Sequence, residues 1–193
     1  MGATALAKRL DAIWETPHTL IGSLTTVDHK AIGKRYLVTA FIFLCLGGIE
    51  AALMRAQLTR PNEHLLSAEA YNQLFTMHGT TMMFLYAAPI LSGFSNYFVP
   101  LLIGSRDMAF PRLNAFSYWI FLFAGIFLYS SFLVGAAPNG GWFNYVPLTA
   151  RPFDPGINID FYCIALIFLS VSTTVGAVNF IVTILRMRAP GMT

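Results

Sequence analysis

Four long apolar segments divide this chain of 193 residues and decide what it can fold into. Each approaches or exceeds the roughly 20 residues that an α-helix needs to cross a hydrocarbon core about 30 Å thick. We expect membrane-spanning helices over residues 36–54, 70–102, 113–134 and 161–185. The second segment is unusually long, and Pro89 in its middle predicts a kink. The predicted fold class is therefore all-α, as a polytopic membrane protein with four transmembrane helices.

The composition excludes other classes of protein. Only 11% of the residues are charged and 56% are hydrophobic, whereas a soluble domain carries about 25% charged residues. Low polarity excludes intrinsic disorder, and two cysteines inside apolar segments, Cys45 and Cys163, exclude a disulfide scaffold. The net charge of +3 comes from basic residues in short flanks between the apolar segments. We therefore expect the lipid bilayer as a partner and no nucleic acid.

The distribution of lysine and arginine predicts the orientation. Residues 1–35 have no apolar run long enough for a signal peptide, so we expect a mature cytoplasmic segment at the membrane surface. Nine basic residues flank one side of the predicted spans: Lys8, Arg9, Lys30, Lys34, Arg35, Arg106, Arg112, Arg186 and Arg188. Arg55, Arg60 and Arg151 flank the other side. The positive-inside rule places both termini in the cytoplasm, with residues 36–187 as the transmembrane portion and 188–193 as a cytoplasmic tail or a break before further helices.

His78 is the first candidate for chemistry, because it lies about two turns into the second apolar segment. Ionisable groups at membrane depth mark function by default. Its neighbours Gly79, Thr80 and Thr81 are small and would leave room for a flat macrocycle, which suits an axial haem ligand. A hydrogen-bonded structural histidine has the same local pattern, so both readings stay open. The other histidines lie outside the predicted spans and supply no second ligand: His18, His29 and His64.

Two charged residues near the outer end of the first span need an explanation. Glu50 and Arg55 are five residues apart and therefore lie on neighbouring rather than identical helix faces. An arginine at this position is typical of a snorkelling anchor. Glu50 lies deeper, where a carboxylate needs a proton or a partner, and is a possible membrane carboxylate site.

The connection after the second span carries one carboxylate, Asp107, between Arg106 and Arg112. One interpretation is an ion-paired turn. The other is a proton entry point, from which the amides of Asn96 and Asn114 could hold a file of water molecules that leads into the membrane. His78 and Asn96 are 18 residues apart, or about 27 Å along a helix, so the histidine lies near the outer face and the amides near the inner one.

Taken together, these stretches resemble the N-terminal third of subunit I of the haem-copper oxidases. The similarity lies in residues 28–33, 53–58, 76–82, 107–114, 176–181 and 187–192, and the His78 and Asp107 motifs are the specific ones. The resemblance implies that the four spans form part of a bundle of about twelve helices. No other chemistry is indicated, because the chain has no phosphate-binding loop, no metal-spaced Cys and His cluster and no catalytic triad.

The resemblance also implies roles for single residues. His78 occupies the place of an axial ligand of the low-spin haem iron, and Arg55 that of the arginine bonded to the formyl group of haem A. Asp107 resembles the entrance carboxylate of the D proton channel, and Asn96 and Asn114 match the asparagines of its gate. Ala115 departs from the family pattern, which often has a second asparagine there.

The oxygen-reducing site is expected outside this chain, which therefore contains no catalytic residue of its own. The implied function is that of a proton-pumping cytochrome c oxidase in a bacterial inner membrane. Its expected partners are the remaining helices of subunit I, subunits II and III, and cytochrome c or a fused cytochrome domain. A high-spin haem and copper are expected from segments outside the chain.

Two rival functions remain open. A quinol oxidase would use polar residues at the first two spans, and Glu50 and Gln73 match two of them. Leu46 and Ala70 stand where that site has an arginine and a histidine, so cytochrome c is the preferred donor. The other rival is a non-enzymatic membrane protein that carries haem or assists assembly.

Overall fold

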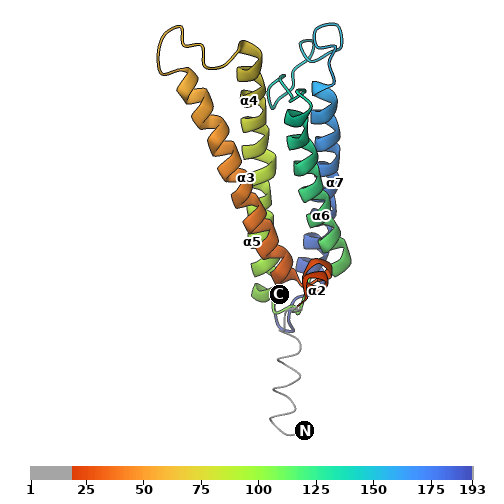
Figure 1. Ribbon diagram of the computed structural model, residues 1–193. Helices are drawn as coiled ribbons and strands as arrows, with labels where there is room; N and C mark the ends of the chain where they lie inside the picture. Colours follow the sequence, from red (N-terminus) through yellow and green to blue (C-terminus); the bar gives the residue numbers. More distant parts are fainter. Residues whose placement is uncertain (1–18, 193) are drawn as a thin grey trace.

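The computed structural model describes residues 19–192. Within that range the chain forms helices and no strand, and four of its helices are long and apolar enough to cross a membrane. The all-α fold with four spans is therefore confirmed. Figure 1 shows successive spans running in opposite directions, in two neighbouring pairs. The termini of the described part lie at one end of the bundle, together with the loop between the second and third spans.

The helices have the following bounds. A short helix, α2 (Leu20–Thr25), precedes the first span, α3 (His29–Gln57). The second span is a continuous rod made of α4 (Ala68–Thr80), the π-helix η1 (Thr81–Ala87) and α5 (Ala88–Leu102). The third and fourth spans are α6 (Pro111–Leu133) and α7 (Asn158–Arg186).

The first span begins at His29, earlier than the predicted start at residue 36. Asp28 caps it, and its carboxylate accepts a hydrogen bond from the amide of Ala31. The charged residues of the first two turns lower the local hydropathy without preventing a helix, because an N-cap satisfies its free amides. His29 is therefore in the first span and is 1% exposed, which corrects the expectation that it lies outside the spans.

The irregularity predicted at Pro89 takes the form of a π-helix. Proline provides no amide hydrogen to the preceding turn, and η1 ends two residues before it. The rod continues as α5 without a break, so Pro89 lies inside the second span rather than at its end.

Close packing of small and aromatic side chains holds the bundle together. The rings of Tyr36 and Phe121 stack with centroids 5.3 Å apart between α3 and α6. Gly33 and Gly93 bring α3 and α5 into backbone contact, because a Cβ atom on Gly33 would lie 2.9 Å from the Gly93 carbonyl oxygen. Cys45 and Cys163 are free thiols on exposed faces, so no disulfide joins them.

Candidate functional site

The hydrogen bond made by His78 determines which of its ring nitrogens can bind a metal. His78 lies in the last turn of α4, half-buried, and its Nδ1 is 2.9 Å from the carbonyl oxygen of Gly47 on α3. A carbonyl oxygen only accepts, so Nδ1 carries the hydrogen and Nε2 keeps its lone pair. Nε2 has no hydrogen-bond partner in the described part of the chain.

Gly47 allows this contact because it has no side chain. A Cβ atom at this position would lie 3.0 Å from Sδ of Met82 and 3.3 Å from Cγ2 of Thr81. The α3 backbone therefore approaches the start of η1 closely enough for its carbonyl to reach the imidazole. A backbone carbonyl bonded to the second ring nitrogen is a common way to orient a metal-binding histidine.

The small residues after His78 pack against other parts of the chain. Thr80 and Thr81 are at most 1% exposed, and a Cβ atom on Gly79 would lie 2.8 Å from Cδ1 of Trp142. The loop after α6 brings Trp142 there. The Gly141 amide donates to Thr76 Oγ1 at 2.8 Å, which holds that loop against α4. These three small residues therefore contact protein, while the half-buried imidazole of His78 keeps Nε2 available to a ligand.

The donor chemistry of His78 fits an axial haem ligand. Its tautomer is fixed, its free nitrogen is Nε2, and its side chain is neither fully buried nor fully exposed. Residues 19–192 contain no group of three or more His, Cys, Asp and Glu side chains that could hold a metal ion.

Arg55 and Glu50 differ sharply in their surroundings. Arg55 is exposed in the last turn of α3, and no carboxylate in residues 19–192 pairs with it. Glu50 is 5% exposed, and neither of its oxygens has a hydrogen-bond partner among the described residues. Tyr129 interacts electrostatically with Glu50 and shares a 2.8 Å hydroxyl contact with Thr81. Arg55 and Glu50 therefore do not form an ion pair with each other.

Side chains of α7 hold the loop that carries Asp107. The Asn179 amide accepts from the backbone amide of Phe110 at 2.9 Å and donates to its carbonyl at 3.1 Å. Thr183 Oγ1 accepts from the Ala109 amide at 2.9 Å. Both α7 side chains are fully buried, so this loop has a fixed conformation. It lies at the end of the bundle that also holds the two ends of the described chain, which we call the foot of the bundle.

Asp107 forms no ion pair with an arginine in residues 19–192. Within the described residues it pairs with neither Arg106 nor Arg112, both of which are exposed. Burial raises the pKa of Asp107 above its ordinary value, opposed by a hydrogen bond from the Met108 amide and by the nearby His29. The ion-paired turn is therefore the weaker interpretation of this loop.

Four buried polar atoms near this end lack hydrogen-bond partners in the described part of the chain. They are His29 Nε2, Arg35 Nη2, Asn96 Oδ1 and Asn114 Nδ2. His29 Nδ1 donates to the Asn96 carbonyl at 2.9 Å, so one contact joins α3 to α5. Buried polar atoms without protein partners are normally satisfied by ordered water. The two asparagines predicted from the sequence thus lie on α5 and α6 with unused hydrogen-bonding capacity.

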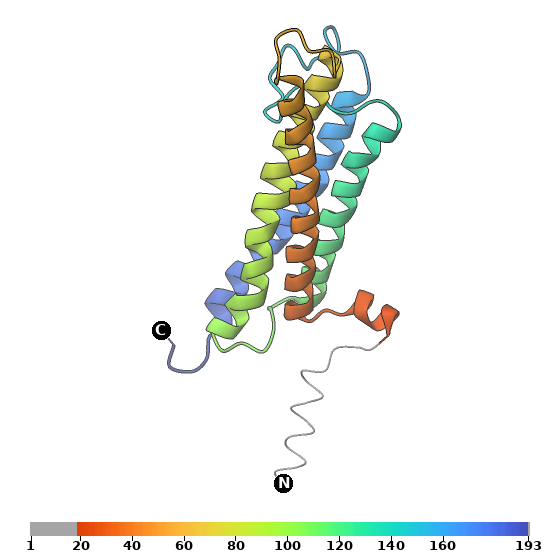
Figure 2. The ribbon, with the colours of Figure 1, turned by 60° about the vertical axis from the view of Figure 1, so that its left-hand side comes forward.

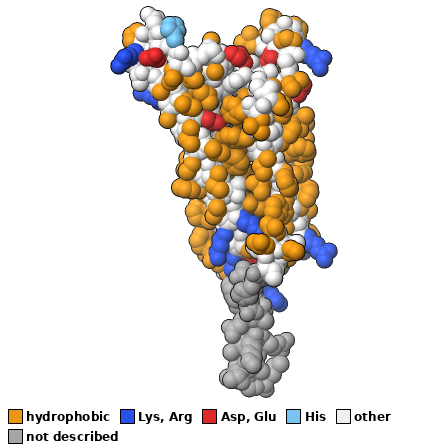
Figure 3. Space-filling view, viewed as in Figure 1, with side chains coloured by type: hydrophobic (Ala, Val, Ile, Leu, Met, Phe, Trp, Pro, Cys, Tyr) orange, Lys and Arg blue, Asp and Glu red, His pale blue; other side chains and the backbone are white. Residues whose placement is uncertain are grey.

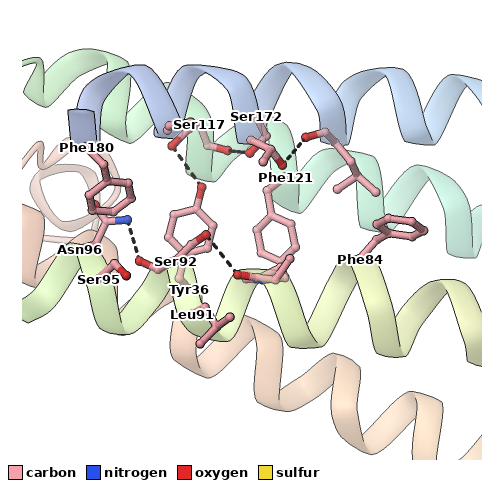
Figure 4. Close-up of a pocket in the computed structure, with 16 residues that line it drawn as sticks. Tyr36, Phe84, Leu91, Ser92, Ser95, Asn96, Ser117, Phe121, Ser172 and Phe180 are labelled. Atoms are coloured by element: carbon pink, nitrogen blue, oxygen red, sulfur yellow. Dashed lines mark hydrogen bonds between the residues drawn. The ribbon is translucent and has the colours of Figure 1, made fainter. Parts of the chain in front are cut away.

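A cavity of about 240 Å³ runs along the bundle from Asn96. Figure 4 shows it between Asn96 at one end and Phe84 at the other. Tyr36 and Ser117 hydroxyls are 3.1 Å apart in its wall, and Ser172 Oγ donates to the Ser117 carbonyl at 2.7 Å. Phe84 is six residues beyond His78, or about 9 Å along the helix.

Sequence reasoning missed the hydroxyl-bearing wall of this cavity and His29. Tyr36, Ser117 and Ser172 come from three different spans, so no local pattern joins them. Serine is also common in membrane helices, where it often bonds to its own backbone. A signal did exist for His29, because it precedes an apolar segment by about two helical turns and follows a good N-cap, Asp28.

Comparisons with known proteins give one family. The family model described as cytochrome c and quinol oxidase polypeptide I matches residues 31–193. A Streptomyces coelicolor protein named for cytochrome c oxidase subunit 1-beta is 51% identical over 98% of this chain and 34% of its own length.

Two further relatives come from other organisms. Cytochrome c oxidase subunit 1 of Bacillus subtilis is 49% identical over 88% of the chain and 27% of its own length. Heme-copper oxidase subunit I+III of Aeropyrum pernix is 49% identical over 88% of the chain and 21% of its own length. The chain thus spans about a third or less of the length of these relatives.

Proposed function

Because the chain belongs to the family of cytochrome c and quinol oxidase polypeptide I, we propose that it supplies four membrane spans of the catalytic subunit of a proton-pumping haem-copper oxidase. The reaction is the transfer of electrons from cytochrome c to oxygen, with water as product. The observation that carries this proposal is the fixed tautomer of His78, whose Nε2 is free.

In this proposal Nε2 of His78 would hold the iron of a low-spin haem A. The Gly47 carbonyl holds the ring in the required orientation. Arg55, exposed at the outer end of the same helix as Gly47, hydrogen-bonds the formyl group. When bound, the haem accepts and passes on one electron at a time.

The proton path in this proposal begins at Asp107. Its loop is held by Asn179 and Thr183, so the carboxylate stays at the foot of the bundle. Water between Asn96 and Asn114 would use their unsatisfied amide atoms, and the Tyr36, Ser117 and Ser172 hydroxyls would continue the path. Each of these groups would take up one proton and give up another, so that it returns to its starting protonation state.

Other segments and partners complete the enzyme. The second axial ligand, the high-spin haem and the copper come from further helices of subunit I, and subunits II and III join them. The electron donor is cytochrome c or a fused cytochrome domain. The complex lies in the bacterial inner membrane, with residues 1–35 and 188–193 on the cytoplasmic side.

An oxygen-consumption assay on the assembled complex tests this function. Reduced cytochrome c should support oxygen uptake, with acidification outside sealed vesicles oriented as in the cell. Oxygen uptake with ubiquinol or menaquinol but not with cytochrome c would support the quinol oxidase instead. A complex with haem but without oxygen uptake from either donor would favour a non-enzymatic haem carrier.

A further inference from the structure

The helix α2 presents apolar side chains at the foot of the bundle without packing them on the protein. Leu20 is 85% exposed, Ile21 is 75% exposed and Leu24 is 52% exposed. Figures 1 and 2 show α2 beside the foot of α3, away from the axis of the bundle. Exposed leucine and isoleucine at a membrane boundary are typical of a helix that lies in the interface.

Arg35 connects α2 to α6 through unusual contacts. Its guanidinium carbon lies 5.9 Å from the ring centroids of both Tyr118 and Trp119. Its Nη1 donates to the Leu24 carbonyl at 3.4 Å, a long bond, and its Nη2 is buried without a hydrogen-bond acceptor. The two rings therefore hold a cation in a fixed place.

The charge of Arg35 is not neutralised by the part of the chain that the structure describes. No described carboxylate forms an ion pair with Arg35, and Asp28 on the same side of the bundle pairs with Lys30 at 2.6 Å. A partly buried cation without a counter-charge is costly, so an anion from outside the chain would stabilise it. The neighbouring Lys34 is exposed and adds a second positive charge.

The surroundings of Arg35 are those of a membrane interface. Trp119 is half-buried and stacks on Phe123, with ring centroids 5.9 Å apart. Tryptophan is enriched at the level of the lipid headgroups. Figure 3 shows basic side chains at this end of the bundle, next to the apolar surface that separates it from the charged residues of the opposite end. Val38, one turn along α3 from Lys34, is 60% exposed and continues the apolar surface towards the membrane centre.

We propose that Arg35, Lys34 and α2 form a binding site for the phosphate of an anionic phospholipid. Arg35 and Lys34 bind the headgroup, α2 inserts Leu20 and Ile21 beside it, and the acyl chains lie along α3. This site requires only that the bundle is in a membrane, so it does not depend on the proposed oxidase activity.

Native mass spectrometry of the delipidated, assembled complex tests the site. The complex is titrated in detergent with phosphatidylglycerol and, separately, with phosphatidylcholine. One phosphatidylglycerol should bind more tightly than phosphatidylcholine. Arg35→Gln should weaken phosphatidylglycerol binding at least about fivefold, the factor that one cation near an anionic surface is worth. Arg188→Gln is the matched control, because Arg188 is an exposed basic residue at the same end, and it should bind as the wild type does.

A second variant separates a lost site from a misfolded complex. Leu20→Ser with Ile21→Ser keeps both cations and should also weaken phosphatidylglycerol binding, while gel filtration shows an intact complex. Equal phosphatidylglycerol affinity in wild type and Arg35→Gln would overturn the proposal, as would equal affinity of the wild type for both lipids. Competition by millimolar inorganic phosphate would also contradict it, because the site would then bind the free anion rather than the lipid.

Discussion

The hydrogen bond between His78 and Gly47 ties the chemistry of one residue to the packing of two helices. The carbonyl fixes the imidazole tautomer, and the missing side chain of Gly47 allows α3 to come within reach. Neither feature is visible in the sequence around His78, because Gly47 is 31 residues away. The residue type and its depth could be predicted, but its partner could not.

Gly47→Ala tests this dependence. The new methyl group would lie 3.0 Å from Met82 Sδ, so we expect a loss of about 1 to 3 kcal/mol of stability. The displaced carbonyl should also shift the absorption band of the low-spin haem in the assembled complex. Gly48→Ala is the control, because its methyl group would meet nothing within 4 Å. Thermal unfolding and visible spectra measure both effects, and identical results for the two variants would show that the close approach is unimportant.

Asp107→Asn tests the proposed role of Asp107 as the proton entry point. Removing the titratable group should slow proton uptake about 10²-fold, the low end of what a positioned acid or base contributes. The haem spectra should stay unchanged, because the loop lies at the opposite end of the second span from His78. Stopped-flow proton uptake by the assembled complex measures the rate. Normal uptake and pumping would return Asp107 to a structural role.

The raised pKa of Asp107 also predicts a pH dependence of stability. The folded chain keeps this proton at pH values where the unfolded chain has released it. The contribution of Asp107 to stability therefore falls as the pH rises from its ordinary pKa through the raised one. Thermal unfolding between pH 4 and pH 8 should show a wild-type decrease that Asp107→Asn lacks. Parallel curves for the two proteins would refute this assignment.

At the scale of helices, the spans could be predicted from apolar length, whereas their ends and irregularities could not. Lys30, Lys34 and Arg35 concealed the first two turns of α3, because hydropathy does not distinguish a charged loop from a helix that extends into the headgroups. Pro89 indicated a disturbance in the second span, but the sequence did not predict that it contains a π-helix.

Asn179 on α7 positions the loop between α5 and α6, and its replacement tests this contact between elements. Asn179→Ala would leave the amide and carbonyl of Phe110 without their partners, each at a cost of about 1 to 3 kcal/mol. We expect lower thermal stability and slower proton uptake through Asp107. Thr174→Ala is the control on the same helix, because Thr174 is exposed. Proton uptake that stays normal in Asn179→Ala would mean that the hydrogen bonds between Asn179 and Phe110 do not position Asp107.

For the whole molecule, the bundle buries only part of its surface, as expected of a chain that spans about a third or less of its relatives. The number of spans could be predicted from the sequence, and so could the placement of His78 and Asp107 towards opposite ends of the second span. The cavity between the bundle halves could not, because Tyr36, Ser117 and Ser172 converge from three spans.

The proposed orientation places the Asp107 loop in the cytoplasm. A membrane-impermeant maleimide should fail to label Arg106→Cys in intact spheroplasts and should label it after lysis. Tyr145→Cys, on the loop at the opposite end, should be labelled in both preparations, since Tyr145 is 69% exposed. The background for both variants carries Cys45→Ser and Cys163→Ser. Labelling of Arg106→Cys from outside would reverse the proposed topology.

The central claim is that His78 binds the iron of a low-spin haem, and His78→Ala in the assembled complex tests it most directly. The measurement is the low-spin haem signal, by visible absorption and electron paramagnetic resonance, with His64→Ala as an exposed control. We expect His78→Ala to lose the signal and His64→Ala to retain it. A normal bis-histidine spectrum in His78→Ala would contradict the claim and leave His78 as a structural residue bonded to Gly47.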